Sequence, residues 1–339
     1  MPVPCRRVRT SFLHLADTRL GFRDPADPTV FEQVAKQFRF AIDYALDQRA
    51  AFVVFSGNLF DSADLDPDSL QVVLRGLERL AEKNVSAIAI RGQHDMRHQP
   101  GVMTWHEMLS QENLLATLEV GLGDGRMALR RWERRDGSGS YFDLGRCRVF
   151  GLHYYGSMTS PLVQAMAKSV AGLDNREMDF RVLLLHGPLE HFSDVLGPKL
   201  SYSDVLMLRR HVDYVALGGC DSSYEAEGWV YNPGPNGFYH VSVDTAVEPK
   251  HHTRYVAYPS ALVVSRPAQP VLQLSRRAIE ETIFDELIAR AGGTEEEKTS
   301  RRDVLRLVTQ SMGGAANAVE LQARLMEVAA RMPEAQRAS

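Results

Sequence analysis

The strongest constraint on the fold is an alternation of short apolar runs with helix-length amphipathic segments in the N-terminal part of the chain. The runs 8–16, 51–56 and 85–90 are typical of buried strands. Between them, residues 30–50 and 66–83 repeat apolar side chains at helical spacing. A strand–helix–strand–helix–strand order predicts parallel strands joined by crossover helices, in a sheet covered on both faces.

The rest of the chain is less regular. Residues 126–152 predict two or three antiparallel strands around a turn at 136–139, and 161–171 predict a helix. Further strands are expected at 181–187, 212–219, 229–232, 238–243, 254–258 and 261–265. Residues 276–331 show helical periodicity in two or three pieces. The sequence therefore predicts a main domain over 1–275 and a C-terminal helical extension over 276–339.

Composition excludes some classes of protein. A net charge of −4 gives no overall basic field for nucleic acid, and 44% hydrophobic residues is ordinary for a globular chain. The three cysteines, Cys5, Cys147 and Cys220, form no CxxC motif, which is typical of a reducing compartment. Without an N-terminal apolar leader or an apolar run of about 18 residues, we expect a cytoplasmic protein with no membrane span.

Polar residues follow five of the predicted strands, at the point where each strand ends. They are Asp17 to Arg19, Gly57 to Asp61, Gly92 to Asp95, His186, and Gly218 to Asp221. The carboxyl ends of the strands in an open α/β sheet gather at one edge, and ligands bind there. We therefore expect these five loops to form one site.

The order of these loops resembles that of the calcineurin-like metallophosphoesterases, most closely the SbcD-like nuclease subunit of DNA double-strand-break repair. That pattern runs Asp-x-His, Gly-Asp-x-x-Asp, Gly-Asn-His-Asp, a lone His, and Gly-His-x-His. The flanks FLHLADTRLGF, VVFSGNLFDSAD and VDYVALGG also match, and the resemblance covers residues 8–265. It implies a four-layer α/β/β/α sandwich in which two divalent cations share a bridging Asp and activate a water.

Most of the metal-ligand positions of this pattern are changed in the chain. Asp17 and His186 keep the family's residue type, and so do Asp61, His94 and Asp95. The substitutions are Arg19 for His, Asn58 for the bridging Asp, Gln93 for Asn, and Gly219 and Asp221 for the last two His. A carboxamide cannot supply the shared charge, and a guanidinium has no lone pair to donate.

We therefore expect no dinuclear metal centre and no resident cofactor. If a cation binds, the expectation is one Mn or Mg ion at the degenerate positions Asp17, Asn58, Asp61, Gln93, His186 and Asp221. The new cation and anion at positions 19 and 221 predict that the Arg19 guanidinium fills the lost metal's space, paired with Asp17 and/or Asp221. The resemblance makes His94 the candidate catalytic residue, and Arg19, His94 and His186 the candidate anion-binding set.

Structural readings of the same residues stay open. A lone histidine is more often a buried, hydrogen-bonded side chain than a ligand, which applies to His94 and His186. The arginine-rich run 126–135 is typical of a solvated hairpin, with phosphate-backbone contact as the alternative. His251 and His252 lack partner ligands at usable spacing, so we expect them in a loop.

Three functions remain possible from the sequence. We favour a repair-exonuclease homologue that has lost two-metal hydrolysis and serves as a scaffold or regulatory subunit. The alternative is an active DNA exonuclease or phosphodiesterase using one metal at Asp17, Asp61, His94, His186 and Asp221, and the third is a phosphate- or nucleotide-binding module. The resemblance also implies that the C-terminal helices bind an SMC-like coiled-coil ATPase. DNA and a second copy, held through residues 104–118, are the other expected partners.

Overall fold

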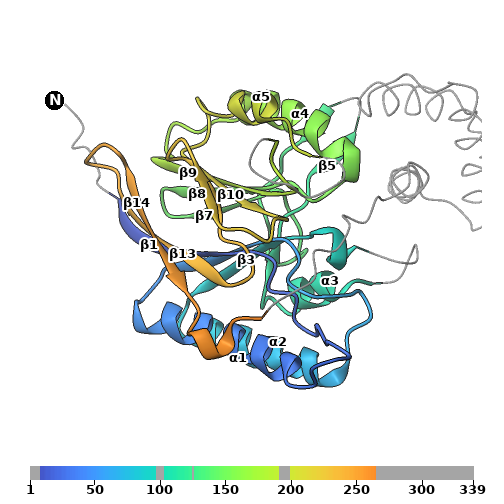
Figure 1. Cartoon of the computed structure of the whole chain (residues 1–339). Helices are drawn as coiled ribbons and strands as arrows, with labels where there is room; N and C mark the ends of the chain where they lie inside the picture. Colours follow the sequence, from blue (N-terminus) through green and yellow to red (C-terminus); the bar gives the residue numbers. More distant parts are fainter. Residues whose placement is uncertain (1–7, 97–102, 124–125, 191–198, 265–339) are drawn as a thin grey trace, which may run out of the picture.

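The computed structural model describes residues 8–96, 103–123, 126–190 and 199–264. Two six-stranded sheets pack face to face, and helices cover the outer face of each (Figure 1). This is the four-layer α/β/β/α sandwich that the sequence predicts. No helix in the described part of the chain is long and apolar enough to cross a membrane.

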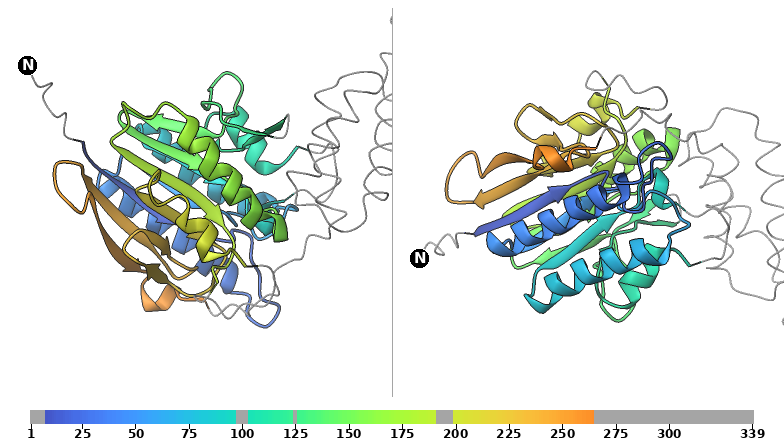
Figure 2. Two further views of the ribbon diagram at one scale, coloured as in Figure 1. Left: turned by 90° about the horizontal axis from the view of Figure 1, so that it is seen from above. Right: turned by 60° about the horizontal axis from the view of Figure 1, so that its bottom comes forward.

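The first sheet contains the parallel strands that the N-terminal alternation predicts. Its order is β14-β13-β1-β2-β3-β4, in which β1 to β4 are parallel to one another and β13 pairs antiparallel with both β1 and β14. The strands are β1 Arg9–Leu15, β2 Phe52–Ser56, β3 Ser86–Ile90, β4 Ala116–Thr117, β13 Gly237–Asp244 and β14 His251–Ala257. The outer face carries α1 Val30–Asp47, α2 Pro67–Glu82 and α3 Trp105–Gln111, and α1 and α2 run side by side (Figure 2).

The second sheet has the order β11-β12-β10-β9-β8-β7. Its strands are β7 Tyr141–Leu144, β8 Cys147–Gly151, β9 Phe180–His186, β10 Tyr214–Gly218, β11 Tyr224–Ala226 and β12 Val230–Asn232. Two helices cover it, α4 Thr159–Gly172 and α5 Tyr202–Leu206. The short elements are β5 Gly121–Gly123, β6 Arg126–Ala128, and the 3-10 turns η1 Gln93–Asp95, η2 Gly156–Met158 and η3 Ser260–Leu262.

Side chains alternate between the two faces of each sheet. They form three layers of core, one between the sheets and one under each helical layer, which separate the four layers of secondary structure. Phe52 and Val54 of β2 face the other sheet, whereas Val53 of the same strand packs against the helices. In β9, Val182 points between the sheets and Leu183 points to the helical side. Successive side chains of a strand leave opposite faces, so one apolar run serves two layers of core.

Three local predictions are wrong. The antiparallel pair β7–β8 turns at Gly145, whose φ is 60°, whereas residues 136–139 lie in a smaller turn that carries one isolated bridge. Of the strand predicted at 261–265, the described residues 261–264 do not pair, because Pro259 follows the end of β14 and the backbone enters η3. His251 and His252 lie on β14, where His251 is buried and bonds the Tyr231 hydroxyl at 3.1 Å. The predicted domain boundary at 275 and the helices beyond it lie outside the described residues.

Candidate functional site

The loops after β1, β2, β3 and β10 are joined by hydrogen bonds through two buried side chains. The Asp17 carboxylate accepts from Asn58 Nδ2 at 2.8 Å and from the Gly219 amide at 2.7 Å. The Asn58 carboxamide oxygen accepts from the His94 amide at 3.0 Å. Asn58 thus holds loops together with one donor and one acceptor, at the position where the resemblance expects a carboxylate between two cations.

Three residues of these loops adopt left-handed backbone conformations. The φ angles of Asp17, Arg19 and Asn58 are 52°, 49° and 53°. Such conformations are uncommon for residues other than glycine, although Asn and Asp tolerate them better than most. They are maintained by the surrounding bonds, among them those from the Asp17 amide to the Gly57 carbonyl and from the Arg19 amide to the Asn58 carbonyl. The first two loops therefore fix each other's shape.

Arg19 is buried in the site and pairs with Asp61. Its side chain is 6% exposed, and Nε and Nη2 lie 2.7 Å and 2.6 Å from the same carboxylate oxygen, Asp61 Oδ1. The guanidinium also lies 4.8 Å from the centre of the Phe22 ring. The sequence predicts that Arg19 pairs with Asp17 and/or Asp221, and the ion pair of its guanidinium described above is with Asp61, from the loop after β2.

His186 is fully buried at the end of β9 and contacts two loops of the first sheet. Its Nδ1 lies 2.7 Å from the Ser56 carbonyl, and its Nε2 lies 3.2 Å from Gln93 Oε1. Because a carbonyl only accepts, Nδ1 carries the proton. His186 and Gln93 therefore contact each other, as the predicted site requires.

Asp95 and His94 play different parts in the loop after β3. Asp95 is buried and accepts from the amides of Gly92 at 2.8 Å and Phe60 at 2.9 Å. Burial alone would raise its pKa, but the nearby His106 and these amides outweigh that effect and leave it lowered. The pKa of the half-buried His94 is lowered by burial and by the charge of Arg19. Asp95 therefore joins the loops after β2 and β3 by hydrogen bonds. Because its pKa is lowered, His94 is uncharged at pH 7.

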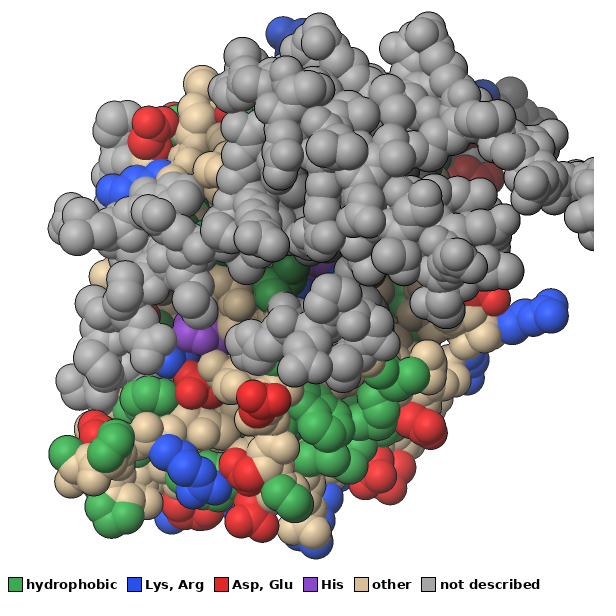
Figure 3. Space-filling view, turned by 90° about the vertical axis from the view of Figure 1, so that its right-hand side faces the viewer, with side chains coloured by type: hydrophobic (Ala, Val, Ile, Leu, Met, Phe, Trp, Pro, Cys, Tyr) green, Lys and Arg blue, Asp and Glu red, His purple; other side chains and the backbone are tan. Residues whose placement is uncertain are grey.

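Gly219 and Asp221 are the remaining predicted ligand positions. Asp221 is exposed, and Gly219 has a φ of 94°, a conformation that side chains rarely adopt. In the described ranges, no group of three or more His, Cys, Asp or Glu side chains is arranged to hold a metal ion. Figure 3 faces the edge where the parallel strands end, and the described surface visible there mixes acidic, basic and apolar side chains.

Sequence reasoning missed two buried polar residues that support the site. His14 on β1 lies between the sheets, where Nε2 donates to the Leu217 carbonyl at 3.1 Å and Nδ1 accepts from the Tyr214 hydroxyl at 3.0 Å. Arg91, the last residue before the Gly92 turn, is buried and bonds Glu119 at 2.6 Å. Two features of the sequence could have indicated them. His14 interrupts the apolar run 8–16, and Arg91 directly follows the apolar run 85–90.

Comparison with curated proteins finds partial similarity to DNA repair proteins, and no protein-family model matches the chain. The DNA double-strand break repair protein Mre11 of Saccharolobus solfataricus is 28% identical over 106 residues, 31% of this chain and 28% of that protein. The Mre11 of Methanococcus maripaludis is 33% identical over 85 residues, 25% of this chain and 23% of that protein. The Mre11 of Aeropyrum pernix is 28% identical over 137 residues, 40% of this chain and 31% of that protein. The matched segments thus span less than a third of each relative's length.

Among solved structures, the chain is similar to the calcineurin-like phosphoesterase YfkN of Bacillus subtilis, with a TM-score of 0.46 and 11% identity. That similarity covers 83% of this chain and 97% of the other. TT1561 of Thermus thermophilus has a TM-score of 0.41 and 13% identity, covering 73% of this chain and 99% of the other. The chain thus shares short segments of sequence with Mre11 proteins and has a four-layer α/β/β/α fold.

Proposed function

We propose that this chain is a DNA-repair nuclease homologue that has lost two-metal hydrolysis and acts as a binding or regulatory subunit. The observation that supports the proposal best is the role of the Asn58 carboxamide. It donates to Asp17 and accepts from the His94 amide. These neutral hydrogen bonds occupy the position where the resemblance implies a carboxylate that bridges two cations.

The chemistry of the other donors supports the same proposal. Asp17 already accepts two hydrogen bonds, and the permanently charged Arg19 stands within the same loops. A dication about 4 Å from a guanidinium would be repelled by several kcal/mol even at a moderate effective dielectric. The residues present do not fit a dinuclear metal centre, and we derive no hydrolytic step through one.

The partner class follows from the relatives rather than from a surface of this chain. Their name places them in DNA double-strand break repair. We propose that the chain binds within a repair complex, with DNA or an SMC-like coiled-coil ATPase as the partner.

A metal-binding and hydrolysis experiment on the full chain tests the loss of activity. Chelator-treated protein is titrated with Mn²⁺ by calorimetry, then assayed on single-stranded DNA and on a generic phosphodiester. We expect no stoichiometric binding and no turnover above that of an Asp17→Asn variant. Mn²⁺-dependent cleavage that disappears in both Asp17→Asn and His94→Ala would overturn the proposal and establish the single-metal nuclease instead.

A further inference from the structure

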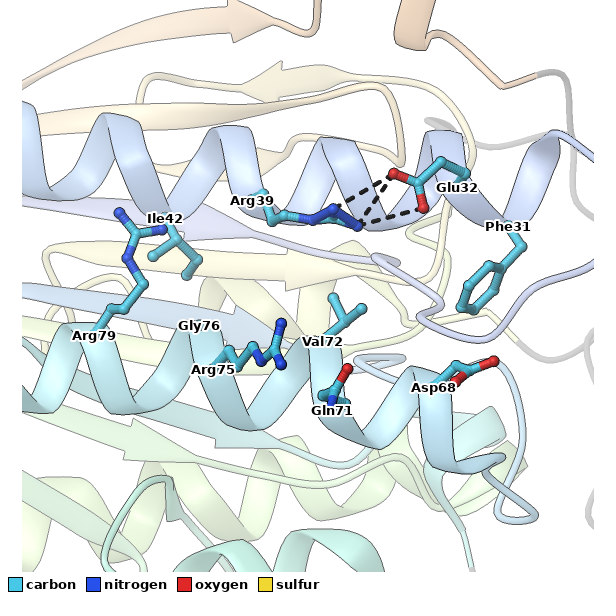
Figure 4. A pocket seen from close by; sticks show the side chains of 10 residues that line it. All are labelled: Phe31, Glu32, Arg39, Ile42, Asp68, Gln71, Val72, Arg75, Gly76 and Arg79. Atoms are coloured by element: carbon cyan, nitrogen blue, oxygen red, sulfur yellow. Dashed lines mark hydrogen bonds and ion pairs between the residues drawn. The ribbon is translucent and has the colours of Figure 1, made fainter.

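A groove between α1 and α2 lies on the outer face of the first sheet, away from the strand-end site. Its volume is about 370 Å³. Phe31, Ile42 and Val72 give it an apolar lining (Figure 4). Arginines from both helices, Arg39, Arg75 and Arg79, stand along it. The lining also includes the acidic Glu32 and Asp68, so the groove combines apolar surface with three arginines and two carboxylates.

Close helix packing at Gly76 shapes this groove. A Cβ atom at position 76 would lie 2.4 Å from Phe38 Cε1 and 3.4 Å from Ile42 Cγ1, so only glycine allows this approach. Glycine inside a helix costs about 1 kcal/mol relative to alanine, and here the close contact between the helices offsets it. The ion pair from Arg79 to Asp43, at 2.7 Å, joins the two helices at this end. The groove is thus part of the packed fold.

Arg75 supplies the uncompensated charge of the groove. Arg39 lies 3.3 Å from Glu32, and Arg79 is paired with Asp43, so each has a carboxylate of α1 beside it. The exposed side chain of Arg75 points toward α1 in Figure 4 and has no hydrogen bond or ion pair with any residue of the described ranges. A ligand that suits the groove brings a carboxylate next to apolar side chains.

The chain itself carries such a segment, and the described residues end beside α1. The Leu262 carbonyl accepts from Gln37 of α1 at 2.7 Å, and Val264 is buried in the core that α1 shares. Within residues 276–290, an apolar stripe at helical spacing is flanked by acids. The stripe is Ile279, Ile283, Leu287 and Ile288, and the acids are Glu280, Glu281, Asp285 and Glu286. The intervening residues 265–275 can span about 35 Å when extended, which exceeds the ~27 Å length of an 18-residue helix.

We propose that residues 276–290 dock as an amphipathic helix in the α1–α2 groove of the same chain. The apolar stripe covers the partly exposed Phe31 and Val72, and a carboxylate of the segment pairs with Arg75. The tether raises the segment's effective concentration to about the millimolar range, so a weak contact suffices to hold it. A partner that binds this segment then has to displace it from the groove.

Photo-crosslinking in the full chain tests the docking. p-Benzoylphenylalanine replaces Gln71, which lines the groove, and in the control it replaces the exposed Glu78 of the same helix outside the groove. Trypsin releases residues 278–290 as one peptide, and a mixture of ¹⁴N and ¹⁵N protein separates capture within a chain from capture between chains. We expect the Gln71 position to capture this peptide within one chain and the Glu78 position to leave it uncaptured.

A charge series at Arg75 sharpens the result. Arg75→Gln should reduce capture about fivefold, the loss expected for one charge-assisted hydrogen bond near the surface, while Arg75→Lys should retain most of it. Arg75 is exposed, and matching melting curves confirm that the variants fold. Equal capture from both positions, no capture of this peptide, or capture only between chains would each overturn the proposal; the last would assign the groove to a second copy.

Discussion

Two fully buried histidines show how differently the inter-sheet core and the strand-end site use the same side chain. His14 and His186 are both inaccessible to solvent, and both bond to Ser56. His14 lies 2.8 Å from the Ser56 hydroxyl, between the two sheets. His186 donates to the Ser56 carbonyl and faces Gln93 in the loop after β3. Ser56 is therefore the residue at which core and site meet.

The difference lies in what surrounds each ring. His14 is enclosed by aromatic side chains of the inter-sheet layer, and burial lowers its pKa to about 3. Its bonds satisfy polar groups that the sheets bury together. The ring of His186 lies at the strand ends and contacts Gln93, one of the positions at which this chain differs from the ligand pattern of the resemblance. Burial alone therefore does not identify a functional histidine.

The largest expected effect is at the site, in Asn58→Asp. The new carboxylate would face Asp17 at the present 2.8 Å contact, and a buried like-charge pair should lower the free energy of unfolding by about 3–5 kcal/mol at pH 7. The loss should shrink toward pH 5, because one carboxyl of the pair has a raised pKa and takes up a proton. Urea unfolding in the presence of a chelator measures both effects.

Asn84→Asp is the matched control for that substitution. Asn84 also has a left-handed backbone, with a φ of 58°, but it is exposed, so the change should cost no more than about 0.5 kcal/mol. If Asn58→Asp is as stable as the wild type without metal, Asp17 is not held as the structure describes.

The next effect concerns the inter-sheet core and its pH dependence. The pKa of His14 is lowered from 6.5 to about 3 on folding, so the unfolded chain binds more protons below pH 6.5. The stability linked to His14 is complete above pH 6.5 and is lost as the pH falls toward 3. From pH 7 to pH 4 the wild type should lose about 3 kcal/mol more than His14→Gln, which has no group to titrate there. Parallel slopes of unfolding free energy against pH in the two proteins would refute this assignment.

The smallest effect distinguishes the two histidines directly. Gln93→Leu removes the amide that contacts His186 Nε2 and should cost about 1 kcal/mol, since Gln93 is partly exposed. Nitrogen-15 NMR should find opposite tautomers in the wild type, with the proton on Nδ1 of His186 and on Nε2 of His14. The substitution should alter the His186 resonances and leave those of His14 unchanged, and the same tautomer for both rings would contradict the geometry.

Much of the fold could be predicted because its signals are local. The predicted strand 51–56 and helix 66–83 agree with β2 and α2 to within a residue or so at each end. The prediction of a strand at 261–265 was wrong, because an apolar composition suits either a strand or a packed turn. The Leu262 carbonyl lies in the turn η3 and accepts a hydrogen bond from the Gln37 side chain instead of from a neighbouring strand. Composition shows that a segment is buried, but not which hydrogen bonds it makes.

The candidate site divides in the same way. The sequence by itself determined which residue types follow each strand, and the parallel order of the strands brings those loops to one edge. Only the tertiary structure decided that Arg19 pairs with Asp61 and that Asn58 bridges Asp17 and the His94 amide. The physical reason is range: a strand's end follows from its own residues, whereas a hydrogen-bond partner depends on how separate loops meet. The left-handed backbone conformations of Asp17, Arg19 and Asn58 determine how the loops contact one another. The packing of these loops in turn stabilises those conformations.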